Sequence, residues 1–224
     1  MPEYNGYGVI WDVDGTLVDT GEMHFASWVQ LAKDHGKPFT RQMFKDTFGR
    51  RNPEIIAEVF GTHYTPEEVS AMGYSKEEYY RASAKHGVDL LPGVRPLLEA
   101  LHEAGFKQAI GSSAPRQNVD LILDLTKAHR YFEAIVTMED TTRGKPDPQV
   151  FLVGAEKLSL APEKCLVMED AVAGIEAAHA GGMKAIGISF VGHHPEQTLK
   201  EAGAELVVKT LAEVSVETVR TILK

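Results

Sequence analysis

The sequence predicts an α/β protein with a doubly wound, Rossmann-like parallel sheet and an all-helical insertion after its first strand. From residue 92 onward, short apolar runs alternate with amphipathic segments of about ten residues, which is typical of βαβ units in a sheet covered on both faces. The first apolar run, at 7–12, is followed by a long stretch with helical periodicity and no alternation of period two. We therefore expect a core formed by residues 1–18 and 92–224, interrupted by a helical domain at 19–91.

The first elements follow from local signals. The apolar run YGVIWD at 7–12 predicts a buried strand, which ends at the turn signal Asp14-Gly15. Apolar residues then recur at the spacing of three and four that marks an amphipathic helix, and the segment 36–38 ends that helix. The stretch 43–86 continues with the same periodicity and predicts further helices.

The remaining elements alternate between the two types. A helix is expected at 94–104, closed by Gly105, and 203–224 predict a last strand and a closing helix. The intervening strands are expected at 106–113, 132–138, 165–170 and 183–189, and the helices between them at 119–125, 148–158 and 171–180.

The composition excludes several classes of partner. With 23 Lys+Arg and 32 Asp+Glu, the chain has a formal charge of −9, which argues against nucleic acid or an anionic membrane as its main partner. The lone Cys165 cannot form an internal disulfide or a thiolate metal cluster. The N-terminal residues lack a basic region followed by a long apolar region, and no stretch approaches the length of a membrane helix. We expect a cytoplasmic protein, either a monomer or a weak homodimer.

Polar side chains directly follow four of the predicted strands. In open α/β sheets, ligands bind outside the carboxyl ends of the strands, so these residues are expected to share one edge. They are Asp12, Asp14 and Thr16 after the first strand, Ser112 and Ser113 after the second, Lys145 in the loop after the third, and Glu169 and Asp170 after the fourth.

Taken singly, several of these residues have ordinary structural explanations. Asp14 suits a turn, and Ser112, Ser113 and Asp170 are each placed to cap a following helix. Four carboxylates in one cleft nevertheless repel one another unless a cation or shared protons compensate. Oxygen ligands at this density suit Mg²⁺, which retains waters that a phosphate can replace. The combination of metal, lysine and hydroxyls predicts a site for phosphoryl chemistry.

Other catalytic motifs are absent from the sequence. No HExxH zinc motif occurs among the nine histidines, and the pair at 193–194 suits a solvated turn. Lys145 is not part of a GxxxxGK[ST] phosphate loop, and the chain contains no GxSxG nucleophile elbow.

The motifs DVDGT at 12–16, Ser112 after a strand, Lys145 in GKPDP and Glu169-Asp170 at a strand end resemble the haloacid dehalogenase (HAD) superfamily. All four of that family's sequence motifs occur here in order, over essentially the whole chain. The insertion at 19–91 resembles the family's helical cap of the first type. Within it, DTGEMHFASW resembles the corresponding segment of the β-phosphoglucomutase subgroup.

The resemblance implies a role for each motif residue. Asp12 would attack phosphorus and form an aspartyl-phosphate. Asp14 would protonate the leaving oxygen and later take a proton from water, and we expect neighbouring carboxylates to raise its pKa. Ser112 and Lys145 would bind the phosphoryl group, with Thr16 and Ser113 beside it. Mg²⁺ would be held by Asp12 and Asp170, by the backbone carbonyl of Asp14, and by Glu169 through water or in the surrounding shell.

The carboxylate at Asp14 also favours phosphate esters over halogenated substrates. The dehalogenases of the superfamily lack a carboxylate at that position, and its phosphonate-cleaving members have alanine there. Dehalogenase activity is therefore not expected.

Two activities within the family remain open. A gapless comparison places Asn52 where the mutase subgroup has its phosphate-binding arginine, although Arg50 and Arg51 lie beside it. His24 and Lys76 occupy positions that the mutases use. We favour a phosphatase that acts on a small phosphorylated metabolite, most simply a sugar phosphate, with β-phosphoglucomutase as the alternative.

Two further classes are weighed against an enzyme. A receiver domain also combines an acidic pair, Mg²⁺ and a lysine before proline, but it needs about half this length and would give the helical insertion no role. A catalytically inactive binding protein of the same fold is disfavoured because no motif residue is missing.

Overall fold

A computed structural model describes residue 4 and residues 6–224. Its centre is a six-stranded sheet in which every pair of neighbours is parallel, with strand order β3-β2-β1-β4-β5-β6. The strands are β1 (Gly8–Trp11), β2 (Lys107–Gly111), β3 (Ala134–Val136), β4 (Cys165–Glu169), β5 (Lys184–Ile188) and β6 (Leu206–Val208). The predicted fold class, an α/β doubly wound sheet with a helical insertion, is confirmed.

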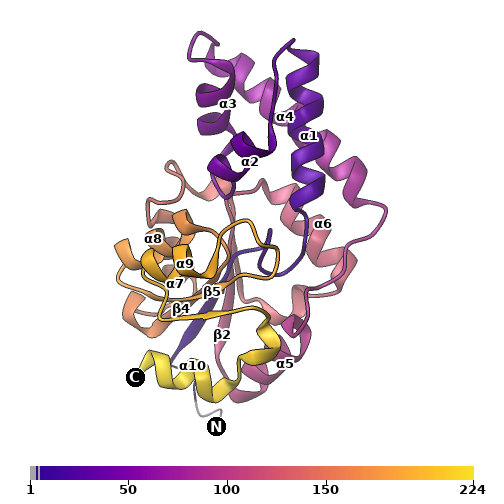
Figure 1. Ribbon diagram of the computed structural model, residues 1–224. Coiled ribbons are helices and arrows are strands. Elements are labelled where there is room, and N and C mark those ends of the chain that lie inside the picture. Colours follow the sequence, from indigo (N-terminus) through magenta and orange to yellow (C-terminus); the bar gives the residue numbers. More distant parts are fainter. Residues whose placement is uncertain (1–3, 5) are drawn as a thin grey trace.

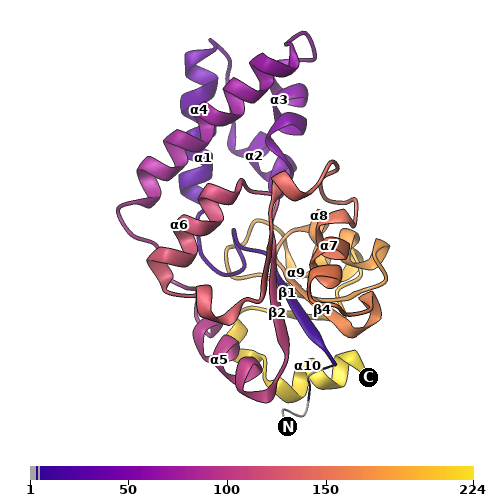
Figure 2. The same ribbon diagram turned by 180° about the vertical axis from the view of Figure 1, so that it is seen from behind.

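Helices cover both faces of the sheet, as the continuous apolar strands require. In Figure 2, α5 and α6 lie on one side of the sheet and α7 and α8 on the other. The helices that follow the insertion are α5 (Val94–Ala104), α6 (Arg116–Thr126), α7 (Gln149–Lys157), α8 (Val172–Ala180), α9 (Glu196–Glu201) and α10 (Val216–Leu223). Short 3₁₀ turns are η1 (His129–Tyr131), η2 (Met138–Asp140), η3 (Pro162–Lys164) and η4 (Leu211–Glu213). The sequence patterns missed α9.

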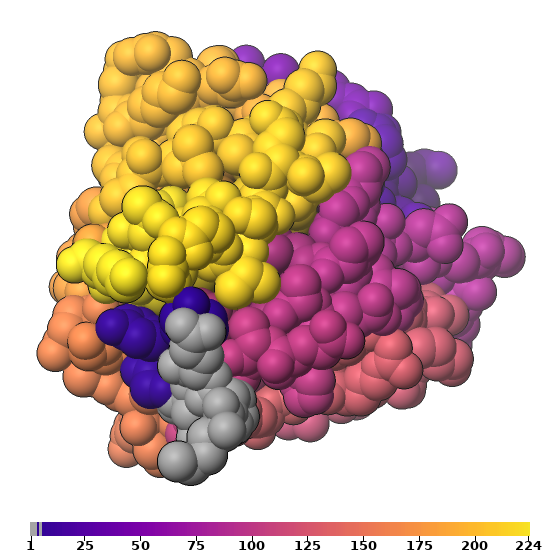
Figure 3. Space-filling model, turned by 90° about the horizontal axis from the view of Figure 1, so that it is seen from below, coloured from indigo at the N-terminus to yellow at the C-terminus, as the bar shows by residue number. Residues whose placement is uncertain are grey.

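Alternation along β1 divides the apolar core in two. Val9 and Trp11 pack with α5, α6 and α10 in one cluster, whereas Ile10 packs with α7, α8 and α9 in the other. Figure 3 shows the end of the molecule where the C-terminal segment lies beside α5, with the helical insertion at the far end. Among the described residues, no helix has both the length and the apolar character that a membrane span requires.

The regular elements of the insertion are all helices, as predicted. Its helices α1 (Gly21–Asp34), α2 (Arg41–Thr47), α3 (Asn52–Phe60) and α4 (Pro66–Ala84) stand together at one end of the sheet (Figure 1). They bury an apolar cluster of their own, which Ala171 of the core joins. Its two connections run side by side, because the backbone N–H of Leu91 donates to the carbonyl of Leu17 at 2.8 Å. The exact domain boundaries at 18/19 and 91/92 stay a prediction.

The connectivity determines where a ligand can bind. The chain builds the sheet outward from β1 to β3 and then returns to the other side of β1 to add β4. In such sheets the crevice outside the carboxyl ends of the strands opens at this reversal point. The residues after β1 and β4 lie at that point, beneath the insertion.

Candidate active site

Three buried carboxylates gather where the strand order reverses. β1 and β4 are adjacent, and the backbone N–H of Asp12 donates to the carbonyl of Met168 at 3.0 Å, which keeps the two strand ends in register. One oxygen from each of Asp12, Glu169 and Asp170 therefore lies within 4.8 Å of the others. All three side chains are almost inaccessible to solvent. The predicted meeting of these motif residues is present in the structure.

Lys145 provides the positive charge at this cluster. Its Nζ donates to Asp12 Oδ1 at 2.7 Å and to Glu169 Oε1 at 2.6 Å, and the residue is 1% exposed. Burial lowers the pKa of Lys145, but the two carboxylates outweigh burial and hold that pKa above its ordinary value. Lys145 is therefore charged at neutral pH and holds Asp12 in place.

One lysine does not compensate three buried carboxylates. Burial raises the pKa of Asp12 to about 8, with Glu169 adding to this effect and Lys145 opposing it. Burial raises the pKa of Asp170 well above its ordinary value, with the charges of Glu169 and Asp12 adding to this effect and Lys145 opposing it. Both Asp170 side-chain oxygens are buried and have no hydrogen-bond partner among the described residues. Such a set of oxygens fits a divalent cation such as Mg²⁺.

Two glycines leave room for these carboxylates. A Cβ on Gly15 would overlap the carboxylate of Asp170, and Gly15 also has a φ of +92°, which disfavours other residues. A Cβ on Gly174 would overlap the carboxylate of Glu169. Asp170 does not cap the helix after it, because α8 begins after Ala171 without a side-chain cap. The ordinary capping explanation for Asp170 is therefore wrong.

Asp14 points away from the cluster and toward the insertion. It lies 3.0 Å from His24 Nε2, and Thr20 Oγ1 donates to it at 2.5 Å. Burial raises the pKa of Asp14, but the charge and hydrogen bond of His24, together with Thr20, outweigh burial and lower it to about 2. The expected rise in this pKa is wrong in this arrangement, because the nearest group is a histidine and not another carboxylate.

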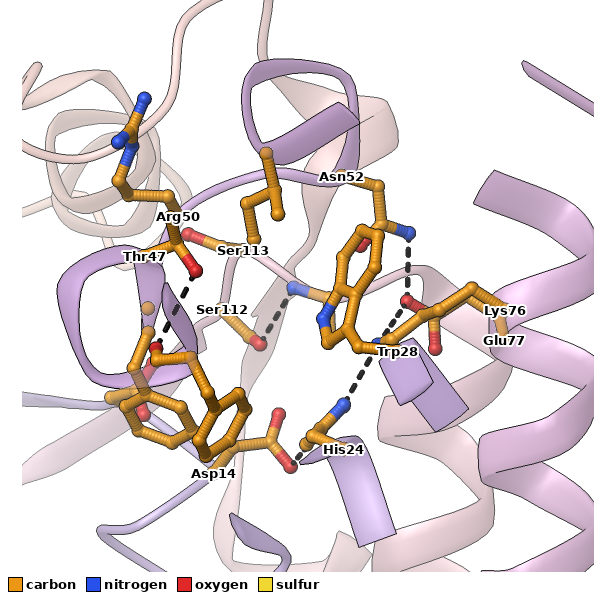
Figure 4. A pocket seen from close by; sticks show the side chains of 16 residues that line it. Asp14, His24, Trp28, Thr47, Arg50, Asn52, Lys76, Glu77, Ser112 and Ser113 are labelled. Atoms are coloured by element: carbon orange, nitrogen blue, oxygen red, sulfur yellow. Dashed lines mark hydrogen bonds and ion pairs between the residues drawn. The ribbon is translucent and has the colours of Figure 1, made fainter. Parts of the chain in front are cut away.

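A chain of polar contacts continues from Asp14 into the insertion (Figure 4). His24 Nδ1 lies 2.8 Å from Lys76 Nζ, and Lys76 Nζ donates to Glu77 Oε1 at 2.8 Å. Glu77 also accepts from Asn52 Nδ2 at 2.7 Å and from Asn118 Nδ2 at 2.6 Å. His24 and Lys76 thus reach the site as expected, and they connect an acid of the core to α4.

Comparison with known families decides the classification. The profile described as haloacid dehalogenase-like hydrolase matches residues 9–188, which include all four motifs. The chain belongs to this family.

Curated HAD relatives include both phosphatases and a mutase. The chain is 34% identical to β-phosphoglucomutase of Bacillus subtilis, over 93% of this chain and 92% of the relative. It is 30% identical to a phosphorylated carbohydrates phosphatase of Thermotoga maritima, over 90% and 93%. It is also 33% identical to the chloroplastic 5-amino-6-(5-phospho-D-ribitylamino)uracil phosphatase of Arabidopsis thaliana, over 93% of this chain but only 56% of that relative's length.

The fold agrees with solved HAD structures. A crystal structure of β-phosphoglucomutase from Clostridium difficile superposes with a TM-score of 0.87 at 25% identity, covering 100% of this chain and 97% of the other. Both the sequence and the fold therefore place the chain near β-phosphoglucomutase-like HAD enzymes.

A small cavity lies between the insertion and the core. Its volume is about 60 Å³, which corresponds to roughly four to six water molecules. Asp12, Asp14, Ser112 and Ser113 line its core side. Ser112 Oγ accepts from the backbone N–H of Ala114 at 3.1 Å, so this hydroxyl shapes the loop after β2 rather than capping α6. On the side of the insertion it is lined by His24, Trp28, Phe44, Thr47, Phe48, Gly49, Arg50, Asn52, Ile55, Lys76 and Glu77.

The two predicted arginines behave differently. Arg50 lines the cavity, but its guanidinium pairs with Glu54 at 3.7 Å and Glu58 at 2.6 Å and points away from Asp14 (Figure 4). Arg51 does not line the cavity, and its Nη2 donates to the carbonyl of Met138 in η2 at 3.2 Å. Thr16 is fully buried, and its hydroxyl has no hydrogen-bond partner among the described residues.

Sequence patterns missed Trp28, Glu77 and Asn118, and they misjudged His193. Glu77 directly follows Lys76, and Asn118 lies five residues after Ser113, so proximity to a motif was the only available signal. His193 is not a solvated turn residue. Its ring packs against Phe44 and Phe48 of the insertion, with centroids 5.6 and 4.1 Å away.

Proposed function

We propose that the chain is a phosphatase that hydrolyses a small sugar phosphate through an aspartyl-phosphate on Asp12. The observation that carries the proposal is the buried group of Asp12, Glu169 and Asp170 around Lys145, at the reversal point of the sheet. The relatives from Thermotoga maritima and Arabidopsis thaliana, whose names describe phosphatases of phosphorylated compounds, support hydrolysis as the reaction.

Two aspartates divide the chemistry. One carboxylate oxygen of Asp12 attacks phosphorus, the ester P–O bond breaks, and Asp14 gives a proton to the departing oxygen. Asp14 then takes a proton from a water molecule, whose oxygen attacks the phosphoryl group, releases inorganic phosphate and regenerates Asp12. Because His24 and Thr20 hold Asp14 ionised in this arrangement, the acid role requires Asp14 to leave them when substrate binds.

The remaining core residues bind the phosphoryl group and the metal. Lys145 neutralises charge and orients Asp12, and Ser112 and Ser113 bind phosphoryl oxygens. Mg²⁺ would be held by Asp12 and Asp170 and by the backbone carbonyl of Asp14; when bound, it screens the negative charges of the nucleophile and the phosphate. Glu169 already accepts from Lys145 and from the backbone N–H of Ala171 at 2.7 Å, which suits a role beside the metal rather than on it.

The insertion at 19–91 is proposed to act as a mobile cap. The cavity of about 60 Å³ has room for only a few water molecules, which is less than a sugar phosphate needs, so substrate entry requires the cap to move. The paired connections near residues 17–20 and 90–93 provide a hinge. Small-angle scattering with and without a phosphate analogue and Mg²⁺ tests this idea, and identical profiles would contradict a large closure.

Hydrolysis is favoured over isomerisation by the lining of the cavity. A mutase must hold a bisphosphate by both ends, but Arg50 is paired with two glutamates and Asn52 binds Glu77. Two observations favour the alternative, β-phosphoglucomutase. His24 lies beside Asp14 and contacts Lys76, and the relative from Bacillus subtilis is a β-phosphoglucomutase.

The hydrolase proposal is tested with para-nitrophenyl phosphate. We expect Mg²⁺-dependent phosphate release that excess chelator abolishes and that Asp12→Ala eliminates. The control Asp124→Ala removes a carboxylate that is 73% exposed on α6 and should retain full activity. Full activity in chelator, or in Asp12→Ala, would overturn the proposal.

A second assay separates the two reactions. The protein is given β-glucose 1-phosphate with a trace of glucose 1,6-bisphosphate, and glucose 6-phosphate and free phosphate are followed together. A phosphatase releases phosphate, whereas fast isomerisation with little release identifies a mutase.

A further inference from the structure

The carboxylate of Glu77 is an unusual feature in the wall of a phosphate-binding cavity. Its side chain is 4% exposed and lines the same cavity as Asp12 and Asp14. Burial raises its pKa, but Lys76, His24 and the hydrogen bond from Asn52 outweigh burial and lower it. Glu77 therefore carries a full negative charge at neutral pH, in a cavity whose substrate is an anion.

Glu77 cancels the nearest positive charge of the cap. Lys76 Nζ lies 2.8 Å from Glu77 Oε1 and is itself buried, so the pair is neutral as seen from the cavity. The other cation in the cap wall, Arg50, is paired with Glu54 and Glu58. Among the described residues that line the cavity, the cap therefore offers no uncompensated lysine or arginine to a second phosphate.

We propose that Glu77 is a specificity-determining residue, which makes the cavity select monophosphates with an uncharged, hydroxylated distal end and reject bisphosphates. This inference rests on the proposed phosphatase function, and it names the class of substrate. A second phosphate in the cavity would lie beside the Glu77 carboxylate and could not pair with Lys76, whose charge Glu77 already compensates, in a site sheltered from water where an unpaired anion is costly. Selectivity thus arises from a repulsive element as well as from attractive contacts.

The rest of the cap wall suits hydroxyl groups and C–H surfaces. Asn52 donates to Glu77 through Nδ2, while its side-chain carbonyl oxygen has no hydrogen-bond partner among the described residues and can accept from a hydroxyl. The indole of Trp28 stands between Ser112 and the pair of Asn52 and Glu77 (Figure 4). An aromatic face of this kind packs against the C–H groups of a sugar or polyol while its N–H remains available as a donor.

The test measures inhibition of para-nitrophenyl phosphate hydrolysis by matched ligands. For each protein, glucose 6-phosphate is compared with glucose 1,6-bisphosphate, and fructose 6-phosphate with fructose 1,6-bisphosphate. The readout is the ratio of the inhibition constant of the bisphosphate to that of its matched monophosphate, so a general change in activity cancels. In Glu77→Gln we expect bisphosphate binding to improve relative to monophosphate binding by at least about tenfold. The control Glu78→Gln removes the adjacent carboxylate, which is 53% exposed, and should leave the ratio unchanged.

A charge-preserving variant separates the role of the charge from a merely structural role. Glu77→Asp keeps a carboxylate at this position but shortens the side chain, so the hydrogen bonds from Asn52 and Asn118 are perturbed while the charge remains. We expect Glu77→Asp to keep the wild-type ratio within about threefold. A ratio that moves to the Glu77→Gln value would overturn the assignment to charge.

A measurement on the wild-type protein does not depend on whether a variant folds. If the cap disfavours a second phosphate, each monophosphate binds the wild type more tightly than its matched bisphosphate. Tighter binding of the bisphosphate shows that the cap attracts the second phosphate and overturns the proposal. An unchanged ratio in Glu77→Gln also overturns it but leaves the phosphatase intact. Absence of para-nitrophenyl phosphate hydrolysis by the wild type would instead contradict the proposed function.

Discussion

Two aspartates that are two residues apart are expected to affect stability in opposite directions. The pKa of Asp12 rises from 3.8 to about 8, mainly because the carboxylate is buried. Because the folded-state pKa is above the unfolded value, stability falls as pH increases from about 4 to about 8. At pH 7 the carboxylate of the unfolded chain is about three pH units above its pKa of 3.8, and this interval corresponds to about 4 kcal/mol. Asp12→Asn removes this penalty and should stabilise the metal-free protein by up to that amount.

Asp14 shows the reverse behaviour. Burial is outweighed by His24 and Thr20, so its pKa falls from 3.8 to about 2. A lowered folded-state pKa contributes stability above pH 3.8 that is lost as pH falls through about 2. Asp14→Asn therefore removes about 2 kcal/mol of stability at pH 7.

Urea unfolding in excess chelator at pH 7 measures both effects, and para-nitrophenyl phosphate hydrolysis should be lost in both variants. The two isosteric changes serve as controls for each other, because each replaces one buried carboxylate by an amide. Saturating Mg²⁺ should stabilise the wild type more than Asp12→Asn, since the variant lacks one of the proposed ligands. An Asp12→Asn protein that is less stable than wild type in chelator, or an Asp14→Asn protein that is more stable, would refute the electrostatic reasoning.

Three other predictions concern the surroundings of the cluster. Lys145→Met leaves Asp12 and Glu169 buried without a cation, so we expect the free energy of unfolding in chelator to fall by about 3 to 5 kcal/mol. Urea unfolding measures this loss, and a loss below about 1 kcal/mol would contradict the prediction. In Gly174→Ala the added methyl displaces Glu169, so we expect at least a tenfold lower kcat/KM and a smaller thermal shift with Mg²⁺. The control is Gly6→Ala, in which the added methyl meets no neighbour. If both variants had the same kcat/KM and the same thermal shift, Gly174 would not be needed to make room for Glu169. Burial lowers the pKa of His193 to about 4, so the free energy of unfolding of the wild type should fall by about 1 to 2 kcal/mol as the pH decreases from 6.5 to 4. His193→Phe should not show this loss. Parallel plots of stability against pH for the two proteins would rule the prediction out.

Much of the fold could be predicted because it depends on local periodicity. The apolar run before Asp12 and the alternation of strands and helices after residue 92 reflect burial on both faces of a sheet. The helical insertion was predicted from the spacing of its apolar residues. Element ends were less accurate, and α9, a helix of six residues, was missed because so short a segment carries little periodicity.

The core of the site could be predicted for a related reason. Residues that directly follow parallel strands must meet at one edge, so Asp12, Lys145, Glu169 and Asp170 could be grouped without coordinates. Their number also implied a cation, since the repulsion among buried carboxylates depends on proximity and not on detailed geometry.

What remained undetermined depends on contacts across the boundary between insertion and core. The sequence by itself determined the fold class and the carboxylate cluster, because these follow from periodicity and from the order of strands, and its four ordered motifs indicated the family by resemblance. Only the tertiary structure decided that Asp14 pairs with His24, which reverses the direction of its pKa shift. It also decided that Glu77 accepts a hydrogen bond from Asn118, 41 residues away, across the boundary between insertion and core. Local sequence carries no record of such pairs, because they are set by how two separately packed units lie against each other.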